Sequence, residues 1–306
     1  MPHQKKNILI IKLSALGDFI QALGPMAAIR RAHPDDHITL LTTKIFKNFA
    51  EKCGYFDHII IDDRPQALDI KGWLKLRKNL KAGHFKRVYD LQNNDRTGLY
   101  FKLLSQKPEW VGIAKGASHR NTSKDRKAGH AIDGHIQTLA LAGINDITID
   151  KLEWMEDDIS AFPLEKPYVM LVPGCTPSRP EKRWPAEKYG QLSNMLTEKG
   201  LQPVIIGTKD EQEAVDTILK SCPSALNLID KTSFYHITTL ARDAAGAIGN
   251  DTGPMHMIGA TGSKCIVLFS HASDPVKHAP KGEHVTTLQK ENLNDLDAKE
   301  VIAQFN

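Results

Sequence analysis

The sequence GNDTGPMH at Gly249–His256 is the stretch around which the chain is organised. An apolar run at residues 244–248 predicts a strand that stops here, and Asp251 or Thr252 is placed to cap a helix that follows. Pro254 falls in the first turn of that helix, where its missing N–H removes no hydrogen bond. A strand that leads into a helix N-terminus offers free N–H groups and the positive end of a helix dipole, which together favour phosphate. The same pattern also fits an ordinary strand–helix connection.

A second turn of this kind follows the first apolar run of the chain. The aliphatic residues 7–13 (NILIIKL) predict a strand buried on both faces of a parallel sheet, and the turn at residues 14–18 (SALGD) leads into a helical pattern. The Gly-x-Gly-x-x-Gly fingerprint is absent there, which argues against a standard dinucleotide site. The carboxylate of Asp18 therefore stands at the tip of the first strand. It can act as a general base or cap its helix, a role that Ser14 could also fill.

Strand-like and helix-like segments alternate along the chain, which indicates an α/β fold with parallel sheets. The predicted strands of the first half lie at residues 7–13, 38–42, 58–61, 87–91 and 111–113. Those of the second half lie at residues 168–172, 203–207, 225–229, 244–248 and 265–269.

Two domains are expected from this alternation, at residues 1–150 and 168–306. Residues 151–167 mix acidic positions, a tryptophan and two prolines without a sustained period, and they predict an interdomain linker. Each domain should be Rossmann-like and doubly wound. In such folds a ligand binds at the carboxyl ends of the strands, here in a cleft that the two domains face.

Composition limits the class of protein. Of 306 residues, 41% are apolar and 25% charged, which is typical of a soluble globular chain. No apolar run approaches the ~20 residues needed to span a bilayer, and the first residues do not resemble a signal peptide. The four cysteines are scattered without a Cys-x-x-Cys pair, which argues against a disulfide framework or a zinc ribbon and suits a reducing cytosol.

Charge is distributed unevenly between the two halves. Residues 1–150 contain 24 Lys and Arg against 15 Asp and Glu, whereas residues 151–306 contain 16 against 21. The basic first half suggests contact with an anionic molecule, although a solvated basic surface is the alternative. Two basic segments stand out, at residues 71–87 and 115–127, and the loop at residues 120–127 is the better candidate for such contact.

The second half contains two further candidate segments. Residues 172–185 form a long loop with basic residues near its end, and basic side chains at a strand's carboxyl end suit a diphosphate. The segment GTKDE at residues 207–211 ends another strand and could hold a ribose or base. The group His271, Asp274 and His278 is more consistent with a structural or substrate-facing role than with a metal site, since zinc needs converging ligands.

Three motifs occur in the order and spacing of a known family. They are Lys-x-Ser-x-x-Gly-Asp at residues 12–18, Lys-x-Trp-Pro at residues 182–185 and Asp-Thr-Gly-Pro-Met-His-Met at residues 251–257, with Asp90-Leu91-Gln92, Arg96 and His130-Ala131-Ile132-Asp133 between them. Over nearly its whole length the chain resembles the lipopolysaccharide heptosyltransferases, glycosyltransferase family 9. The resemblance implies a GT-B fold, an ADP-heptose donor and an acceptor on the lipid A–Kdo inner core.

The resemblance also implies roles for individual residues. Asp18 matches the general base, and Lys182 matches a lysine that contacts the donor phosphate. The diphosphate turn comprises Asp251, Thr252 and Gly253, followed by Met255 and His256, the latter expected to pack or hydrogen-bond within its helix. The nucleoside contact falls at Lys209 and Asp210, although Lys209 stands where the family has an acid. The residues expected to contact the acceptor are Ser14, Gly17, Asn94, Arg96, Arg120, Lys124, Arg126 and Lys127.

The sequence therefore predicts an inverting glycosyltransferase that uses neither a metal nor a cofactor, ADP-heptose being a substrate. Lys182 and the amides near Gly253 would neutralise the leaving diphosphate. We expect a monomer without a nucleic-acid partner, cytoplasmic and peripheral on the cytoplasmic face of the inner membrane. Two alternatives stay open: transfer from another nucleotide-sugar to a different surface glycan, and nucleotide binding without catalysis.

Overall fold

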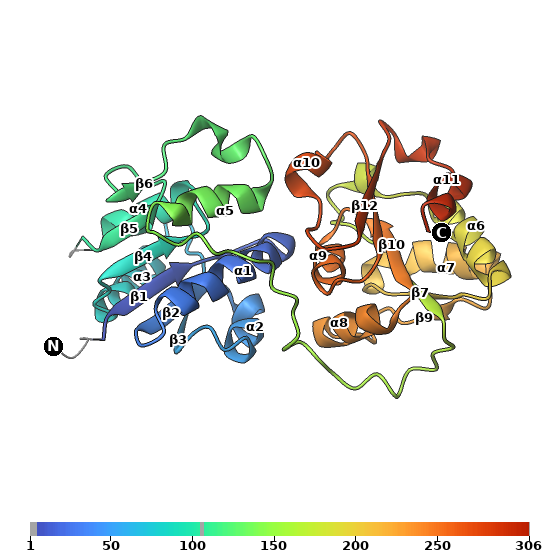
Figure 1. Cartoon of the computed structure of the whole chain (residues 1–306), viewed down its shortest axis with the longest axis horizontal. Helices are drawn as coiled ribbons and strands as arrows, with labels where there is room; N and C mark the ends of the chain where they lie inside the picture. Colours follow the sequence, from blue (N-terminus) through green and yellow to red (C-terminus); the bar gives the residue numbers. More distant parts are fainter. Residues whose placement is uncertain (1–4, 105–106, 306) are drawn as a thin grey trace. The chain divides into compact units, whose positions relative to one another are not determined.

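The computed structural model describes residues 5–104 and 107–305, and it divides into two compact units, Met1–Asp150 and Lys151–Asn306. Each unit is a parallel six-stranded sheet with helices on both faces (Figure 1). The predicted α/β fold class, with two doubly wound sheets, is thereby confirmed.

Unit 1 has the strand order β3-β2-β1-β4-β5-β6. Its strands are β1 (Asn7–Ile11), β2 (His37–Thr42), β3 (His58–Ile61), β4 (Arg87–Asp90), β5 (Glu109–Gly112) and β6 (His119–Arg120). Its α-helices are α1 (Leu16–Ala32), α2 (Lys47–Lys52), α3 (Ile70–Ala82), α4 (Asp95–Leu103) and α5 (Ala131–Ala140). The order of the strands reverses between β1 and β4, so the loops that follow these two strands lie side by side.

The core of unit 1 explains why residues 8–11 of β1 are all aliphatic. Leu9 and Ile11 of β1 belong to one apolar cluster with Leu76 and Leu80, which project from α3. Because helices cover both faces of a parallel sheet, the alternate residues of β1 are buried too, and residues 8–11 are all fully buried. The inner side of α3 is thereby fixed against the sheet.

Unit 2 has the strand order β12-β11-β10-β7-β8-β9. Its strands are β7 (Tyr168–Val172), β8 (Gln202–Ile205), β9 (Leu226–Asn227), β10 (Gly246–Asn250), β11 (Cys265–Phe269) and β12 (Val285–Gln289). Its α-helices are α6 (Ala186–Glu198), α7 (Gln212–Ser221), α8 (Phe234–Asp243), α9 (Gly253–Ala260), α10 (Pro275–His278) and α11 (Ala298–Ala303). Here the order reverses between β7 and β10, which brings the two loops after these strands together.

Three local features differ from the sequence-based expectation. The strands β6 and β12 were not expected, because β6 has only two residues and β12 is largely exposed. The strand β10 continues to Asn250, two residues beyond the predicted end at residue 248. Part of the predicted linker contacts unit 2, since Arg242 of α8 donates to the carbonyls of Leu152 and Met155.

Two further observations concern the whole described chain. All four cysteines are buried and unpaired. Within residues 5–104 and 107–305, no helix combines the length and the apolar character that crossing a membrane requires.

Candidate functional site

The turn between β10 and α9 holds an ion pair. Lys182 Nζ lies 2.5 Å from Asp251 Oδ2, and the two side chains are only 17% and 7% exposed. Thr252 is the N-cap residue of α9 but makes no side-chain cap hydrogen bond, and the Asp251 carboxylate binds Lys182 instead. The first N–H groups of α9 therefore lie beside a lysine that comes from a different loop.

Asn250 fixes that loop, which connects β7 to α6, in place. Its fully buried side chain donates through Nδ2 to the carbonyl of Pro173 at 2.6 Å. Its Oδ1 accepts from the N–H of Trp184 and from the Tyr189 hydroxyl, each at 3.1 Å. One amide thus joins β10 to both ends of the segment that carries Lys182. The sequence offered one clue, because a polar residue at the end of a buried strand needs hydrogen-bond partners.

Replacing Asn250 with Ala is expected to lower the free energy of unfolding by roughly 2–4 kcal/mol, because it leaves buried donors and an acceptor unpaired. Urea unfolding, followed by the fluorescence of the four tryptophans, measures this. Asn194→Ala is the matched control, since the Asn194 amide makes an exposed 3.3 Å hydrogen bond to Ser221 Oγ. Equal losses in the two variants would show that Asn250 does not hold the loop.

At the predicted nucleoside end, the side chains point in different directions. Lys209 is 88% exposed and lies 3.9 Å from Asp230, and Asp210 is exposed too. The buried acid is Glu211, whose Oε2 accepts from the N–H and the hydroxyl of Thr208 at 2.8 and 2.9 Å. A Cβ at Gly174 would approach the Glu211 carboxyl to 2.8 Å, so this acid borders the loop after β7. Glu211 lies in the segment 207–211 that the sequence indicates, but it is not among the predicted nucleoside contacts.

Met255 and His256 lie inside α9. Met255 is fully buried in the core of unit 2, and its N–H donates to the carbonyl of Thr252 at 3.1 Å. His256 is also buried. Their side chains thus belong to the body of the helix, while the backbone of Thr252 and Gly253 forms its N-terminus.

In unit 1, Asp18 is exposed in the first turn of α1. Its Oδ2 accepts from the N–H of Ala15 at 3.3 Å. The N-cap residue is Ala15, so the expectation that Ser14 caps this helix is wrong. The N–H groups of Leu13 and Ser14 both donate to Gln92 Oε1, at 2.8 and 3.2 Å, because the loops after β1 and β4 are neighbours.

A buried lysine and a buried carboxyl lie beneath this turn. Burial raises the pKa of Asp90 to about 6, although hydrogen bonds from Thr97 and from the backbone, and the charge of Lys12, act in the opposite direction. Burial lowers the pKa of Lys12, against the attraction of Asp18 and Asp90. Lys12 Nζ also donates to the carbonyl of Leu91 at 3.4 Å. Lys12, the lysine of the first motif, therefore binds the loop after β4 and lies close enough to Asp18 and Asp90 to attract both carboxylates.

The Asp90 carboxyl predicts a pH dependence of stability. Its pKa is higher in the folded chain than the usual ~3.9 of an unfolded one, so folding favours the protonated acid. The contribution to stability is complete below about pH 4 and is lost as the pH rises through about 6, by roughly 3 kcal/mol in all. Urea unfolding at several pH values should show that Asp90→Asn removes this slope. An unchanged slope would contradict the prediction, and Asp35→Asn, at an exposed site, is the control.

A basic hollow of about 710 Å³ lies where β5 and β6 end and α4 begins. Asn94, Arg120 and Arg126 line it, together with Lys102 and Lys115. Three of the predicted acceptor residues, Asn94, Arg120 and Arg126, therefore lie together on one surface. Lys124 and Lys127 belong to the short 3₁₀ turn that also holds Arg126.

Arg96 has a bracing role instead. It donates to the Tyr100 hydroxyl at 2.6 Å and to the carbonyl of Pro65 at 2.8 Å. Its guanidinium carbon also lies 5.3 Å from the ring centre of Trp73. Arg96 thus connects α4 to the segment that precedes α3 and to α3 itself.

Comparison with known proteins identifies the family. The family model described as glycosyltransferase family 9 (heptosyltransferase) matches residues 73–303. The chain belongs to this family. It is 22% identical to the lipopolysaccharide core heptosyltransferase OpsX of Haemophilus influenzae, over 94% of this chain and 86% of that protein.

Solved structures confirm the fold. The glycosyltransferase family 9 structure from Veillonella parvula has a TM-score of 0.82 at 22% identity and covers 99% of this chain and 97% of its own. Escherichia coli heptosyltransferase WaaC, solved with ADP-2-deoxy-2-fluoro heptose, has a TM-score of 0.75 at 17% identity. The match covers 97% of this chain and 98% of that chain. The predicted GT-B fold is confirmed, and the chain is a glycosyltransferase of the heptosyltransferase family.

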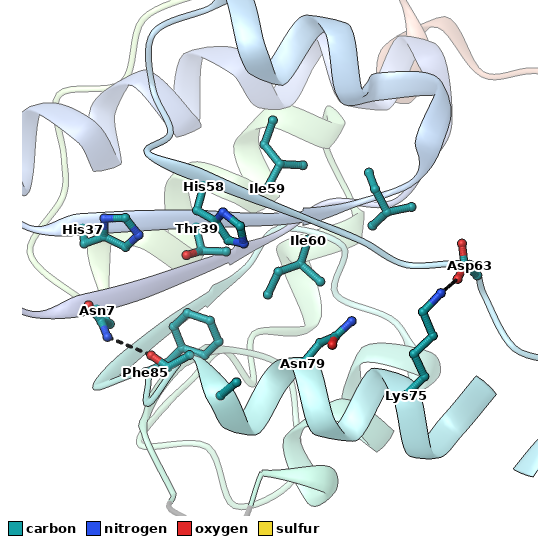
Figure 2. Close-up of a pocket in the computed structure, with 13 residues that line it drawn as sticks. Asn7, His37, Thr39, His58, Ile59, Ile60, Asp63, Lys75, Asn79 and Phe85 are labelled. Carbon is teal, nitrogen blue, oxygen red and sulfur yellow. Dashed lines mark hydrogen bonds and ion pairs between the residues drawn. The ribbon is translucent and has the colours of Figure 1, made fainter. Parts of the chain in front are cut away.

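One further hollow of this heptosyltransferase contains none of the predicted donor or catalytic residues. A hollow of about 530 Å³ lies between α3 and the edge strand β3 (Figure 2), and His37, His58 and Asn79 are among its lining residues. In the part of the chain that the structure describes, no three His, Cys, Asp or Glu side chains are grouped to hold a metal ion. His271 binds the carbonyl of Glu291, and Asp274 caps α10.

Proposed function

We propose that this chain transfers a heptose from ADP-heptose to the inner core of lipopolysaccharide, with inversion at the anomeric carbon. The observation that carries the proposal is the buried Lys182–Asp251 pair at the N-terminus of α9, in a member of the heptosyltransferase family. A related enzyme solved with an ADP-heptose analogue supports the choice of donor.

Unit 2 holds the donor in this proposal. The diphosphate lies at the N-terminus of α9, where the N–H groups of Thr252 and Gly253 and the helix dipole face it. Lys182 binds a phosphate oxygen, and the negative charge that develops on the leaving ADP is stabilised by these groups. Asp251 holds the Lys182 ammonium in position. Lys209 and Asp210 contact the nucleoside, with Glu211 as the buried acid beside them.

Unit 1 supplies the base and the acceptor site. The Asp18 carboxylate takes the proton from an acceptor hydroxyl as the oxygen of that hydroxyl bonds to the anomeric carbon. At the same time the bond between the anomeric carbon and the phosphate oxygen breaks, and ADP leaves with that bond's electron pair. Ser14 and Gly17 flank this carboxylate in the turn after β1. The basic hollow of Asn94, Arg120 and Arg126 binds the phosphates and carboxylates of a lipid A–Kdo acceptor, with Lys124 and Lys127 beside it. No step in this scheme needs a metal ion.

The location follows from the acceptor. A lipid-anchored inner core lies at the cytoplasmic face of the inner membrane while it is assembled, so we place the enzyme there as a peripheral monomer. Its basic first half suits an anionic membrane surface.

Calorimetric titration with ADP, UDP and GDP, followed by a transfer assay in EDTA with a lipid A–Kdo acceptor, tests the proposal. We expect ADP to bind at least tenfold more tightly than UDP or GDP, and heptose to be transferred without added metal. Preference for UDP or GDP would favour another nucleotide-sugar. ADP binding without any transfer would favour a nucleotide-binding protein.

A further inference from the structure

The outer side of α3 is strongly cationic. Residues 70–82 include five Lys and Arg and no Asp or Glu. Leu76 and Leu80 point into the core of unit 1, and at 3.6 residues per turn Lys71 and Lys78 fall on the opposite side of the helix. Both of these lysines are exposed, whereas Lys75 is paired with Asp63 at 2.7 Å (Figure 2).

Large apolar side chains are exposed among these cations. Leu68, Ile70 and Leu74 are 93%, 71% and 56% exposed, and they fall within seven consecutive residues. Single exposed leucines are common on soluble proteins and need no explanation, but a group of three invites a binding role. On α3, Ile70 and Leu74 lie one turn apart on the side that also carries Lys71 and Lys78.

We propose that this surface docks on an anionic lipid bilayer. The lipid-docking face consists of Leu68, Ile70, Lys71, Leu74 and Lys78. The lysines bind lipid phosphates, while Leu68, Ile70 and Leu74 insert among the headgroups and first acyl carbons, as in amphipathic helices that lie in a membrane interface. A nucleic acid would use the lysines but leave the three apolar side chains in water, so charge and apolar character together favour the bilayer.

The position of this face suits an enzyme that acts on an anchored acceptor. The segment before α3 follows the carboxyl end of β3. Asp18 and the basic hollow also lie at the carboxyl ends of strands of this parallel sheet. Arg96 connects that segment to α4, whose N-cap residue Asn94 lines the hollow. Docking would therefore hold the acceptor site of unit 1 at the lipid surface. This use rests on the proposed function, whereas the binding itself does not.

Flotation of the full chain with lipid vesicles measures the binding. With vesicles of phosphatidylcholine plus roughly 30% phosphatidylglycerol the protein should float, and with phosphatidylcholine alone it should not. The double variant Lys71→Gln/Lys78→Gln should lose about 30-fold in partitioning, because each lysine near such a surface contributes about a fivefold factor. Leu68→Ser/Leu74→Ser should also lose partitioning to the phosphatidylglycerol vesicles, because it removes apolar contact with the interface while both lysines remain.

The matched control is Lys220→Gln/Lys281→Gln, which removes two exposed lysines of unit 2 and should float as the unchanged protein does. Thermal melting checks that each variant is folded, and all four substitutions of the test variants are at exposed positions. The proposal is overturned if the unchanged protein does not float, if test and control variants float equally, or if duplex DNA competes fully with the vesicles.

Failure of this inference is distinguishable from failure of the proposed function. Transfer to a soluble acceptor without acyl chains should be the same in the unchanged protein and in both test variants. Flotation without any transfer would support the docking face and contradict heptose transfer. Transfer without flotation would support heptose transfer and contradict the docking face.

Discussion

Replacing Asp18 with Asn should lower the rate of heptose transfer by about 10²–10⁴-fold, the range that a positioned general base contributes. Asn is nearly isosteric and keeps an oxygen that can accept the 3.3 Å hydrogen bond from the N–H of Ala15, so the turn should keep its shape. The affinity for ADP, measured by calorimetry, should change by less than about twofold, because the groups proposed to bind the donor belong to unit 2. A loss confined to kcat is the signature of a group that acts in the transition state.

The control is Asp35→Asn, which removes an exposed carboxylate after the other end of α1. It should leave both kcat and ADP affinity unchanged. Full turnover in Asp18→Asn with bound donor would remove Asp18 from the mechanism. A large loss in both variants would instead indicate damage to unit 1.

Replacing Lys182 with Met should weaken the binding of ADP and ADP-heptose by roughly 10–100-fold, since a charge-assisted hydrogen bond is worth about 1.5–3 kcal/mol. Met retains much of the length of the lysine side chain while removing its ammonium. AMP, which lacks the second phosphate, should lose less affinity than ADP. Calorimetry with the two nucleotides measures both effects.

Two variants separate binding from stability. Lys182→Met leaves the Asp251 carboxylate buried without its ion pair, which lowers stability as well as affinity. Lys182→Met/Asp251→Asn relieves that charge, so it should recover stability but not ADP affinity. Arg179→Met is the matched control, because Arg179 belongs to the same loop but pairs with Glu181 at an exposed position. Equal affinity losses in Lys182→Met and Arg179→Met would show that Lys182 has no specific role.

Much of the fold follows from the sequence because buried parallel strands leave an unmistakable pattern. Residues 8–11 and 168–172 are apolar throughout, and each run lies in the strand at the point where the strand order reverses. The strands β6 and β12 lack this pattern, because β6 has only two residues and β12 is largely exposed. Whether an edge segment pairs depends on the neighbouring strand, which local sequence does not describe.

Within the site, the sequence predicted the helix start after β10 but not the contacts that position it. The role of Asn250 depends on Pro173, Trp184 and Tyr189, which are 61 to 77 residues away in the chain. The buried acid Glu211 is similar: its neighbours in sequence are exposed, and only the close approach of Gly174 marks it out. Long-range contacts of this kind are what the local pattern of residue types leaves unspecified.

The Lys182–Asp251 pair has a consequence for selectivity among anions. Since the ammonium is already neutralised by a neighbouring carboxylate, any incoming ligand has to compete with Asp251 for it. A chloride or acetate ion brings one charge and no second contact, so it is a weak competitor. A diphosphate brings several oxygens and can engage Lys182 and the α9 amides at once. At the proposed diphosphate site we therefore expect Asp251 to disfavour simple anions relative to ligands with two linked phosphates.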